Sequence, residues 1–451
     1  MITALIAATL IKPNVVILFT DDAGYGDFGF TGSTQIATPN IDRIAEEGMT
    51  FTRAYVPGSV CSPSRAGLLT GKSPASIGHE YNLGKQPFDD PEYYGLPLEH
   101  KTIADYLKAE GYRTGLIGKW HLGNADKFHP TQRGFDDVWG LRGGSRSYFE
   151  TNTNSTQRIE TNISGAITTV SYLTDDIGTQ ASEFIERHSG DPFFLFVSFT
   201  GPHGPMHATP EDIDLYNHVE PERRRIYCAM VHAVDRAIGQ ILDTLDQAGV
   251  TKNTLVVFSN DNGGAVTSNS SLNAPYNGMK GTFLEGGIRV PFAARLPGVT
   301  EPGSEFNESI SLIDLTPTAI ELAGGIPPKQ LQGVSLAPHL SGDTQEAPHE
   351  RLFFRRAWTA AMIEGDWKLI RMPDRPSLLF NIEEDPQEQD NRAASEQTRL
   401  ASMLKQLADW EATTKQPFFR TDVFWTKFNR DHYDREYQLT QPQTKTARRS
   451  N

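Results

Sequence analysis

The hydrophobic positions of the chain cluster in short uninterrupted runs, each followed by polar residues. Asn14–Thr20 is mostly valine, isoleucine, leucine and phenylalanine, with a proline before it and two aspartates after it. A run that is apolar at nearly every position is typical of a strand buried on both faces, and such strands usually belong to parallel sheets. Similar runs, with helical patterns between them, occupy residues 112–118, 193–200 and 254–259. This alternation predicts a doubly wound α/β fold, with a large, mixed but mainly parallel sheet flanked by helices.

Three segments have a clear helical period. Thr38 and Pro39 supply a cap and a first-turn proline for a helix that ends at Gly48, and residues 102–110 form a second helix. In the third, the apolar residues recur every three or four positions, at Ile226, Met230, Val234, Ile238, Ile241 and Leu245. We expect the charged run at residues 222–225, at the start of this helix, to be solvated.

The pattern changes after about residue 348. Four short strand candidates lie close together, which favours antiparallel pairing, at residues 352–354, 360–363, 367–370 and 378–380. Ser395 is expected to cap a helix whose apolar face carries Leu400, Met403, Leu407 and Trp410. These elements predict a smaller α+β subdomain that ends near Pro417, followed by a polar tail that wraps the surface or frays. We therefore expect one domain at residues 1–347, and a subdomain with its tail at residues 348–451.

Composition and charge narrow the classes of partner. A hydrophobic share of 38% and a charged share of 22% are ordinary for a soluble α/β protein. The formal net charge of -14 argues against a nucleic acid or an anionic membrane as partner, because both attract basic surfaces. No segment is long and apolar enough to span a membrane. Residues 1–11 are apolar, and fit either a shortened secretory signal or an irregular lead into the first strand.

The two cysteines differ in their surroundings. A disulfide framework in a chain of 451 residues would use more than Cys61 and Cys228. Cys228 lies in a helical pattern among apolar neighbours, which indicates an inert core thiol. Cys61 lies in a loop rich in proline and serine, an unusual place for a structural cysteine.

Polar residues follow each of the four predicted strands. They are Asp21 and Asp22, then Lys119, Trp120 and His121, then His203, and finally Asn260, Asp261 and Asn262. In open parallel sheets ligands bind at the carboxyl ends of the strands, so we expect these groups to converge. Three carboxylates and an amide are hard oxygen ligands that suit calcium or magnesium, with calcium the better fit. Each motif alone is also an ordinary turn or cap sequence, and only their common position favours a metal site.

One loop carries the most specific signal. Residues 61–65 read Cys-Ser-Pro-Ser-Arg and lead into a short helical pattern that contains Leu-Thr-Gly, whose exposed amides would attract an anion. This pattern resembles the signature of the type I formylglycine-dependent sulfatases, the arylsulfatase family of the alkaline phosphatase superfamily. The resemblance runs from Pro13 to about Asn391, and includes residues 118–123, 259–264 and 277–282. It implies a sulfuric ester hydrolase whose cysteine is oxidised by a formylglycine-generating enzyme or an anaerobic sulfatase-maturating enzyme.

The resemblance also implies a role for each matching residue. Calcium would be held by Asp21, Asp22, Asp261 and Asn262, beside the modified Cys61. Arg65 and Lys119 would orient the formylglycine, while His121, His203 and Lys280 would handle protons and sulfate oxygens. The formylglycine hydrate would be the nucleophile, and the surrounding cations would neutralise charge on the sulfonyl oxygens.

Loop residues near these motifs are the candidate substrate contacts, although any of them can be an ordinary surface residue. They are Arg142, Arg146, His79, His207 and Arg356, with Trp358 as an aromatic neighbour. Basic side chains suit an anionic sugar. The resemblance to the family implies a sulfated oligosaccharide or polysaccharide as substrate, and a periplasmic or secreted protein. Two alternatives stay open: a phosphonate monoester or phosphodiester hydrolase of the same superfamily, and a catalytically silent protein that binds sulfated glycans. A binding protein has no need of Cys61, which argues against the second.

The two enzymatic alternatives differ in the ester they prefer. We expect nitrophenyl sulfate to be hydrolysed faster than a nitrophenyl phosphodiester, by about tenfold or more in kcat/KM, because the quoted motifs match the sulfatase signature. The release of nitrophenolate from each ester measures the ratio. A strong preference for the phosphodiester would overturn the sulfatase interpretation.

Overall fold

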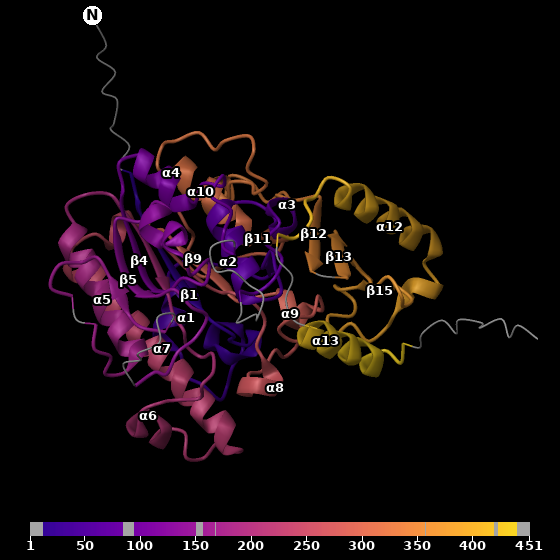
Figure 1. Cartoon of the computed structure of the whole chain (residues 1–451), viewed down its shortest axis with the longest axis horizontal. Helices are drawn as coiled ribbons and strands as arrows, with labels where there is room; N and C mark the ends of the chain where they lie inside the picture. Colours follow the sequence, from indigo (N-terminus) through magenta and orange to yellow (C-terminus); the bar gives the residue numbers. More distant parts are fainter. Residues whose placement is uncertain are drawn as a thin grey trace, which may run out of the picture.

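Two sheets organise the chain. The computed structural model describes residues 12–83, 94–149, 157–166, 168–356, 358–418 and 423–439, so the apolar segment at residues 1–11 lies outside the described residues. A nine-stranded sheet forms the larger body and a four-stranded sheet the smaller one, with a two-stranded pair between β3 (Ala54–Tyr55) and β11 (Ile310–Ser311) (Figure 1). None of the described helices has the length and apolar character needed to cross a membrane.

The large sheet is mainly parallel, as the sequence predicts. Its order is β10-β2-β9-β8-β1-β7-β4-β5-β6. The central strand β1 (Asn14–Thr20) pairs in parallel with both β7 (Phe193–Ser198) and β8 (Thr254–Asn260). The parallel set continues through β4 (Arg113–Lys119) and β5 (Asp137–Leu141). The two edge strands are β10 (Ser304–Phe306) and β6 (Glu160–Thr161), and between β10 and β8 lie β2 (Met49–Phe51) and β9 (Phe292–Arg295). The antiparallel pairings are those of β9 with β2 and β8 and of β6 with β5.

Helices cover both faces of this sheet. Alternate residues of β1 point to opposite faces, and both sets are apolar, so both faces must be buried. Val16 and Leu18 pack in the core under α1 (Pro39–Glu46), α5 (Leu173–His188) and α7 (Glu222–Gln247). Val15, Ile17 and Phe19 pack in the opposite core under α2 (Cys61–Thr70), α4 (Ile103–Ala109) and α10 (Leu315–Leu322). The shorter helices are α3 (Pro74–Ile77), α6 (Pro210–Asp214), α8 (Val266–Asn269), α9 (Glu285–Ile288) and α11 (Ala337–Leu340).

The three predicted helices are present. Pro39 begins α1, and the Thr102 side chain caps α4 by accepting the backbone N–H of Asp105. Cys228 is a buried free thiol in α7, as expected. The expectation of a solvated charged run at residues 222–225 is wrong for Arg224, which is 5% exposed because its guanidinium pairs with a buried carboxylate.

The C-terminal subdomain is an antiparallel sheet with a helix on one face, as predicted. Its strands are β12 (Arg351–Arg356), β13 (Thr359–Glu364), β14 (Trp367–Arg371) and β15 (Leu378–Asn381). One face joins the core of the main sheet through Leu352, Phe354 and Ile370, and the other packs on α12 (Gln397–Glu411). The predicted cap at Ser395 is wrong, because α12 begins two residues later with Glu396 before it. The boundary between residues 347 and 348 stays a prediction.

The tail after Pro417 differs from the prediction. Part of it forms a further helix, α13 (Val423–Glu436), which lies against the main body (Figure 1). Within residues 427–436 the buried side chains are polar or amphipathic, at Asn429, His432 and Tyr433, and they form no apolar stripe in the sequence. The residues after 439 lie outside the described part of the chain.

The segment that leads into β12 is fixed by an ion pair. Nε2 of His349 lies 2.8 Å from both carboxylate oxygens of Asp314, which is fully buried. Burial alone would lower the pKa of His349, but the charge of Asp314 outweighs it and raises the pKa above the usual 6.5. The pair therefore makes its full contribution to the stability of the fold below pH 6.5. This contribution is lost as the pH rises through the pKa of His349 in the folded state.

We expect His349→Gln to lower the free energy of unfolding by about 1.5–3 kcal/mol at pH 6 and by less at pH 9, since glutamine keeps a donor but loses the charge. Urea denaturation of both proteins at the two pH values measures the difference. An equal loss at pH 6 and pH 9 would contradict a charged pair.

Candidate functional site

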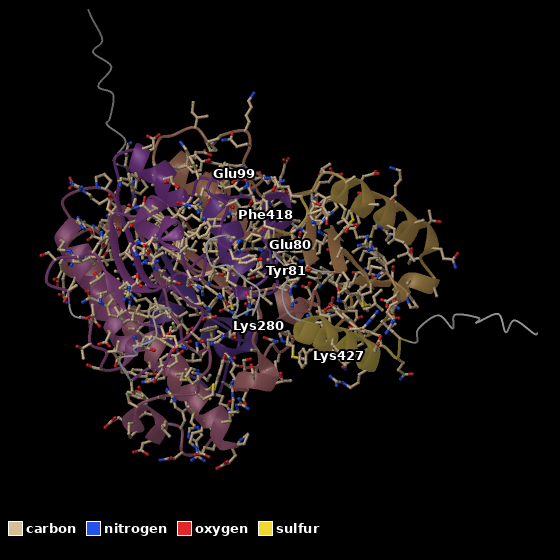
Figure 2. The ribbon with its side chains drawn as sticks, in the orientation of Figure 1. Glu80, Tyr81, Glu99, Lys280, Phe418 and Lys427 are labelled. Carbon is tan, nitrogen blue, oxygen red and sulfur yellow. The ribbon has the colours of Figure 1, made fainter. Side chains whose placement is uncertain are left out.

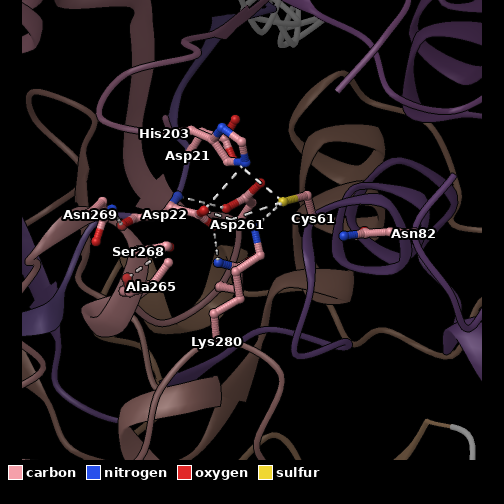
Figure 3. Close-up of polar contacts among 12 residues, drawn as sticks. Asp21, Asp22, Cys61, Asn82, His203, Asp261, Ala265, Ser268, Asn269 and Lys280 are labelled. Atoms are coloured by element: carbon pink, nitrogen blue, oxygen red, sulfur yellow. Dashed lines mark hydrogen bonds and ion pairs between the residues drawn. The ribbon is translucent and has the colours of Figure 1, made fainter. Parts of the chain in front are cut away.

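The polar residues predicted at the strand ends do converge. Asp21 and Asp22 follow β1, and Asp261 follows β8, whose last residue is in register with Thr20. The ligand atoms of these three carboxylates and of Cys61 all lie within 4.8 Å of one another (Figure 3). All four residues are buried. The parallel register of β1 and β8 is therefore what brings residues about 240 positions apart in the sequence into one cluster.

Cys61 is the first residue of α2, so it lies at the positive end of the helix. Asn82 holds this turn in place, because its side-chain oxygen accepts the backbone N–H of Ser62 at 2.9 Å. The Cys61 sulfur lies 3.1 Å from Nζ of Lys280 and 3.4 Å from a carboxylate oxygen of Asp21. Burial, with the charge of Asp261, raises the pKa of the Cys61 thiol well above its usual value. The unmodified side chain is therefore a poor nucleophile.

Each of the three carboxylates faces one cation. Nζ of Lys119 lies 2.6 Å from Asp21, and Nη2 of Arg65 lies 2.9 Å from Asp261. Lys280 places Nζ 2.8 Å from Oδ2 of Asp22 (Figure 3). Burial alone would lower the pKa of Lys280, but the charge of Asp22 outweighs it and raises the pKa. The ammonium group consequently stays protonated at neutral pH.

The cluster fits a divalent cation. Burial and the charge of Asp21 outweigh the effect of Arg65 and raise the pKa of Asp261 to about 6. Burial alone would also raise the pKa of Asp22, but the charge of Lys280 outweighs it and lowers the pKa. The cations present therefore stabilise the charge of Asp22 but leave that of Asp261 only partly compensated.

Asn262 donates its amide to Asp22 at 2.7 Å, while its buried side-chain oxygen has no hydrogen-bond partner among the described residues. A buried acceptor without a partner costs about 1–3 kcal/mol, which a cation would relieve. Three carboxylates and an amide oxygen are ligands that calcium and magnesium prefer.

Two histidines complete the site as neutral groups. Burial, with the charges of Lys119 and other cations, lowers the pKa of His121 well below its usual value. Its Nε2 lies 3.0 Å from the carbonyl oxygen of Leu83, which can only accept, so Nδ1 is the acceptor of the ring. Burial lowers the pKa of His203 to about 4, although the charge of Asp22 opposes this. The His203 side chain is 26% exposed, and its Nε2 lies 3.5 Å from Asp22, so it lies between the metal ligands and solvent.

Two site residues have an unusual backbone. Asp22 and His121 adopt left-handed φ angles of 63° and 57°, a conformation that costs a residue with a side chain about 1–2 kcal/mol. The side-chain amide of Asn269 donates to the carbonyl of Asp22 at 2.8 Å, and the N–H of His121 donates to the carbonyl of Arg142 at 3.0 Å. These contacts hold the strained turns that direct both side chains into the site.

The predicted substrate contacts are engaged with other parts of the protein. Arg142 places its guanidinium 2.7 Å from both Glu160 and Asp126, and Nε2 of His79 lies 2.7 Å from the hydroxyl of Ser62. Burial lowers the pKa of His79 to about 3, so it stays neutral. Their roles in substrate binding stay predictions.

The remaining three candidates are also held by neighbours. Arg146 is buried and donates from Nε to the carbonyl of Ser147, and Nη1 of Arg356 donates to the carbonyl of Gly281 at 2.9 Å. The His207 ring lies 6.1 Å from that of Phe149, which is 40% exposed. Substrate binding by these residues likewise stays a prediction.

Sequence reasoning missed several supporting residues. Ser198, the last residue of β7, accepts a hydrogen bond from Arg65, and its place at a strand end is a signal that could have identified it. The Tyr148 hydroxyl lies 2.7 Å from the carbonyl of Thr200 and 2.8 Å from that of His203, which fixes the His203 loop. Neither Tyr148 nor Asn269 follows a predicted strand, so their sequence context gives no signal.

Comparison with known proteins identifies the family of the chain. The family model described as Sulfatase matches residues 13–326, and the model described as N-sulphoglucosamine sulphohydrolase, C-terminal matches residues 279–413. The chain is 32% identical to N-acetylgalactosamine-6-sulfatase of Mus musculus over 379 residues, covering 79% of this chain and 71% of that protein. It is 32% identical to arylsulfatase H of Canis lupus familiaris, covering 76% of this chain and 75% of that protein.

A solved structure is similar over nearly the whole chain. The crystal structure of Ps i-CgsB in complex with k-i-k-neocarrahexaose is 32% identical with a TM-score of 0.86, and the match covers 95% of this chain and 98% of that one. The matched range of the Sulfatase model, residues 13–326, includes Asp21, Cys61 and Asp261, which meet at the strand ends. The chain therefore belongs to the sulfatase family of the alkaline phosphatase superfamily and is a sulfuric ester hydrolase.

Proposed function

We propose that this sulfatase removes sulfate from a sulfated oligosaccharide or polysaccharide, using a formylglycine made from Cys61 and a bound calcium ion. The observation that carries the proposal is the meeting of Cys61 with three buried carboxylates and three cations at the ends of β1, β4 and β8. A carbohydrate substrate is supported by two similar proteins. Ps i-CgsB is described with a bound neocarrahexaose, and the mouse relative is named for a sulfated amino sugar.

The two cofactors would supply what the side chains lack. A formylglycine at position 61 would supply a hydroxyl group of its hydrate as the nucleophile. The unmodified cysteine is a poor nucleophile because the pKa of its thiol is high. Calcium, held by Asp21, Asp22, Asp261 and Asn262, supplies positive charge for the sulfonyl oxygens.

The cationic side chains bind and orient the sulfate group. Lys119 and Lys280 are both buried and reach the same cluster of oxygen ligands, so a sulfate at Cys61 would lie within reach of both ammonium groups. Arg65, fixed by Asp261 and Ser198, holds the first turn of α2 toward them. Charge that builds on the sulfonyl oxygens is neutralised by groups already in position, at little cost in reorganisation.

Protons move through the groups around Cys61. Lys280, which stays protonated at neutral pH, protonates the departing alcohol oxygen. His203 lies on the same side of the cluster, beside Asp22, and would donate only after it had taken up a proton itself. His121, with Nδ1 as acceptor, is the base that assists the expulsion of sulfate. Both histidines are neutral at pH 7, which suits them to accept a proton.

The proposed substrate and modification imply two further features. A formylglycine-generating or anaerobic sulfatase-maturating enzyme would oxidise Cys61, and the protein would act in the periplasm or outside the cell, where large sulfated polysaccharides are present. The search for substrates should accordingly include glycosaminoglycan fragments and algal galactans.

We expect the protein, made together with a maturating enzyme, to release sulfate from at least one defined sulfated oligosaccharide in such a panel. Cys61→Ala should lose turnover by about 10³-fold or more, because the nucleophile is absent, yet still bind the same oligosaccharide. Ion chromatography of released sulfate measures turnover, and calorimetry measures binding.

Mass spectrometry of the peptide around Cys61 supplies the control for this experiment. An unaltered thiol in a preparation that hydrolyses sulfate esters would contradict the mechanism. Turnover of nitrophenyl sulfate without release of sulfate from any carbohydrate in the panel would contradict the proposed substrate class alone.

We expect calcium to raise the melting temperature of the chelator-treated protein, because a ligand at a hundredfold excess over its Kd stabilises the folded state by about 2.7 kcal/mol. Asp261→Asn should lose most of this shift, since it removes one ligand charge. The matched control is Asp409→Asn, an exposed carboxylate on α12 that pairs only with Lys405 in the structure. A calcium shift as large in Asp261→Asn as in the native protein would contradict the proposed site.

A further inference from the structure

Residues 277–285, the loop that carries Lys280 into the site, are bound on several sides by the C-terminal part of the chain. Figure 2 shows Lys280 beside α13, at the junction between the large sheet and the C-terminal subdomain. The peptide next to Lys280 is the most constrained point. The carbonyl of Gly281 accepts hydrogen bonds from Asn429 on α13, at 2.8 Å, and from Arg356 at the end of β12, at 2.9 Å.

The other peptide group of Gly281, which joins it to Lys280, is tied to the Cys61 turn. The N–H of Gly281 donates to the carbonyl of Ser59, two residues before Cys61, at 2.7 Å. Gly281 has a φ of 90°, and a Cβ there would lie 3.0 Å from the Asn429 side chain. Asn429 therefore packs directly on Gly281, whose N–H is held by the residues leading into α2.

A second contact from α13 lies one helical turn further on. The backbone N–H of Phe283 donates to the hydroxyl of Tyr433 at 2.7 Å, and Tyr433 is 1% exposed. Asn429 and Tyr433 are four residues apart, so they lie on the same face of the helix. Tyr437, just after the helix, continues this line and accepts the side-chain amide of Asn277 at 3.3 Å.

The far end of the loop is fixed by a buried ionic group. Lys368 on β14 places Nζ 2.9 Å from Glu285 and 2.8 Å from Glu388, and all three side chains are fully buried. The backbone N–H of Glu285 donates to Glu388 at 2.6 Å. The loop is thus anchored at its end by the C-terminal sheet and along its length by α13.

We infer that α13 is a positioning element for the reaction, and that Asn429 and Tyr433 are positioning residues that set the place of the Lys280 ammonium group. The inference rests on the proposed function, in which Lys280 acts on the sulfate ester. Lys280 lies 2.8 Å from Asp22 and 3.1 Å from the Cys61 sulfur, so a small movement of its backbone would break both contacts. A misplacement of about 1 Å can cost about 10²-fold in rate. Residues 423–436 lie outside both family-model matches, so α13 is a feature that those matches do not describe.

We expect Tyr433→Phe and Asn429→Ala each to lower kcat by about tenfold while KM changes by less than about twofold, because binding is kept and the reacting group is displaced. Initial rates on a sulfate ester measure both constants. The matched control is Asp434→Asn on the same helix. Its carboxylate pairs with Arg375, 2.6 Å from Nε, and makes no described contact with the 277–285 loop. This variant should melt at a lower temperature with kcat unchanged.

A double-mutant cycle separates positioning from general loss of structure. Lys280→Ala alone should lose most activity, and adding Tyr433→Phe or Asn429→Ala should then cost less than about twofold further, because there is no ammonium group left to position. The full tenfold loss in the Lys280→Ala background would overturn the inference, as would unchanged kcat in both single variants. Full activity of Lys280→Ala would instead overturn the proposed role of Lys280, so the two failures are distinguishable.

Discussion

Three carboxylates held together in the protein interior place the strongest constraint on this molecule. Two like charges about 4 Å apart repel by about 4 kcal/mol at the effective dielectric of a protein, so the cluster requires compensating charge. Each compensating cation comes from a different part of the fold: Arg65 from α2, Lys119 from the end of β4, and Lys280 from the loop before α9. The large sheet, the helix that carries Cys61 and the C-terminal subdomain that holds the Lys280 loop are therefore all needed to maintain one small cluster.

Much of the fold could be predicted from the sequence because its central strands are buried on both faces. β1 has the predicted limits, since an apolar run that ends in two aspartates leaves little freedom in where the strand stops. The C-terminal sheet was also predictable, from its close spacing of short apolar segments. α13 was not, because Asn429 and Tyr433 pack through hydrogen bonds to backbone groups about 150 residues away, and such contacts require no hydrophobic period. The cap of α12 was wrong because the Ser395 hydroxyl belongs to the preceding turn, where it donates to the carbonyl of Arg392.

The residues of the site likewise include some that the sequence could predict and some that it could not. Residues that directly follow strands were predictable, because parallel topology alone brings Asp21 and Asp261 together. The left-handed backbone of Asp22 and His121 was not predictable, because neither is a glycine and the contacts that hold them come from distant loops. The predicted substrate residues share this difficulty. Arg142 and Arg356 are basic loop or strand-end residues in the sequence, yet in the fold each is engaged with protein oxygens, so their charge alone does not show what they bind.

The central place of β1 has a consequence for biosynthesis. This strand leaves the ribosome early, but its two neighbours pair with it through residues 194–198 and 254–260. Until translation has passed residue 260, β1 cannot have both of these partners, so the sheet beside Cys61 cannot be completed. In the finished fold Cys61 is 1% exposed. The proposed oxidation of Cys61 would therefore require access to the side chain before the fold is complete.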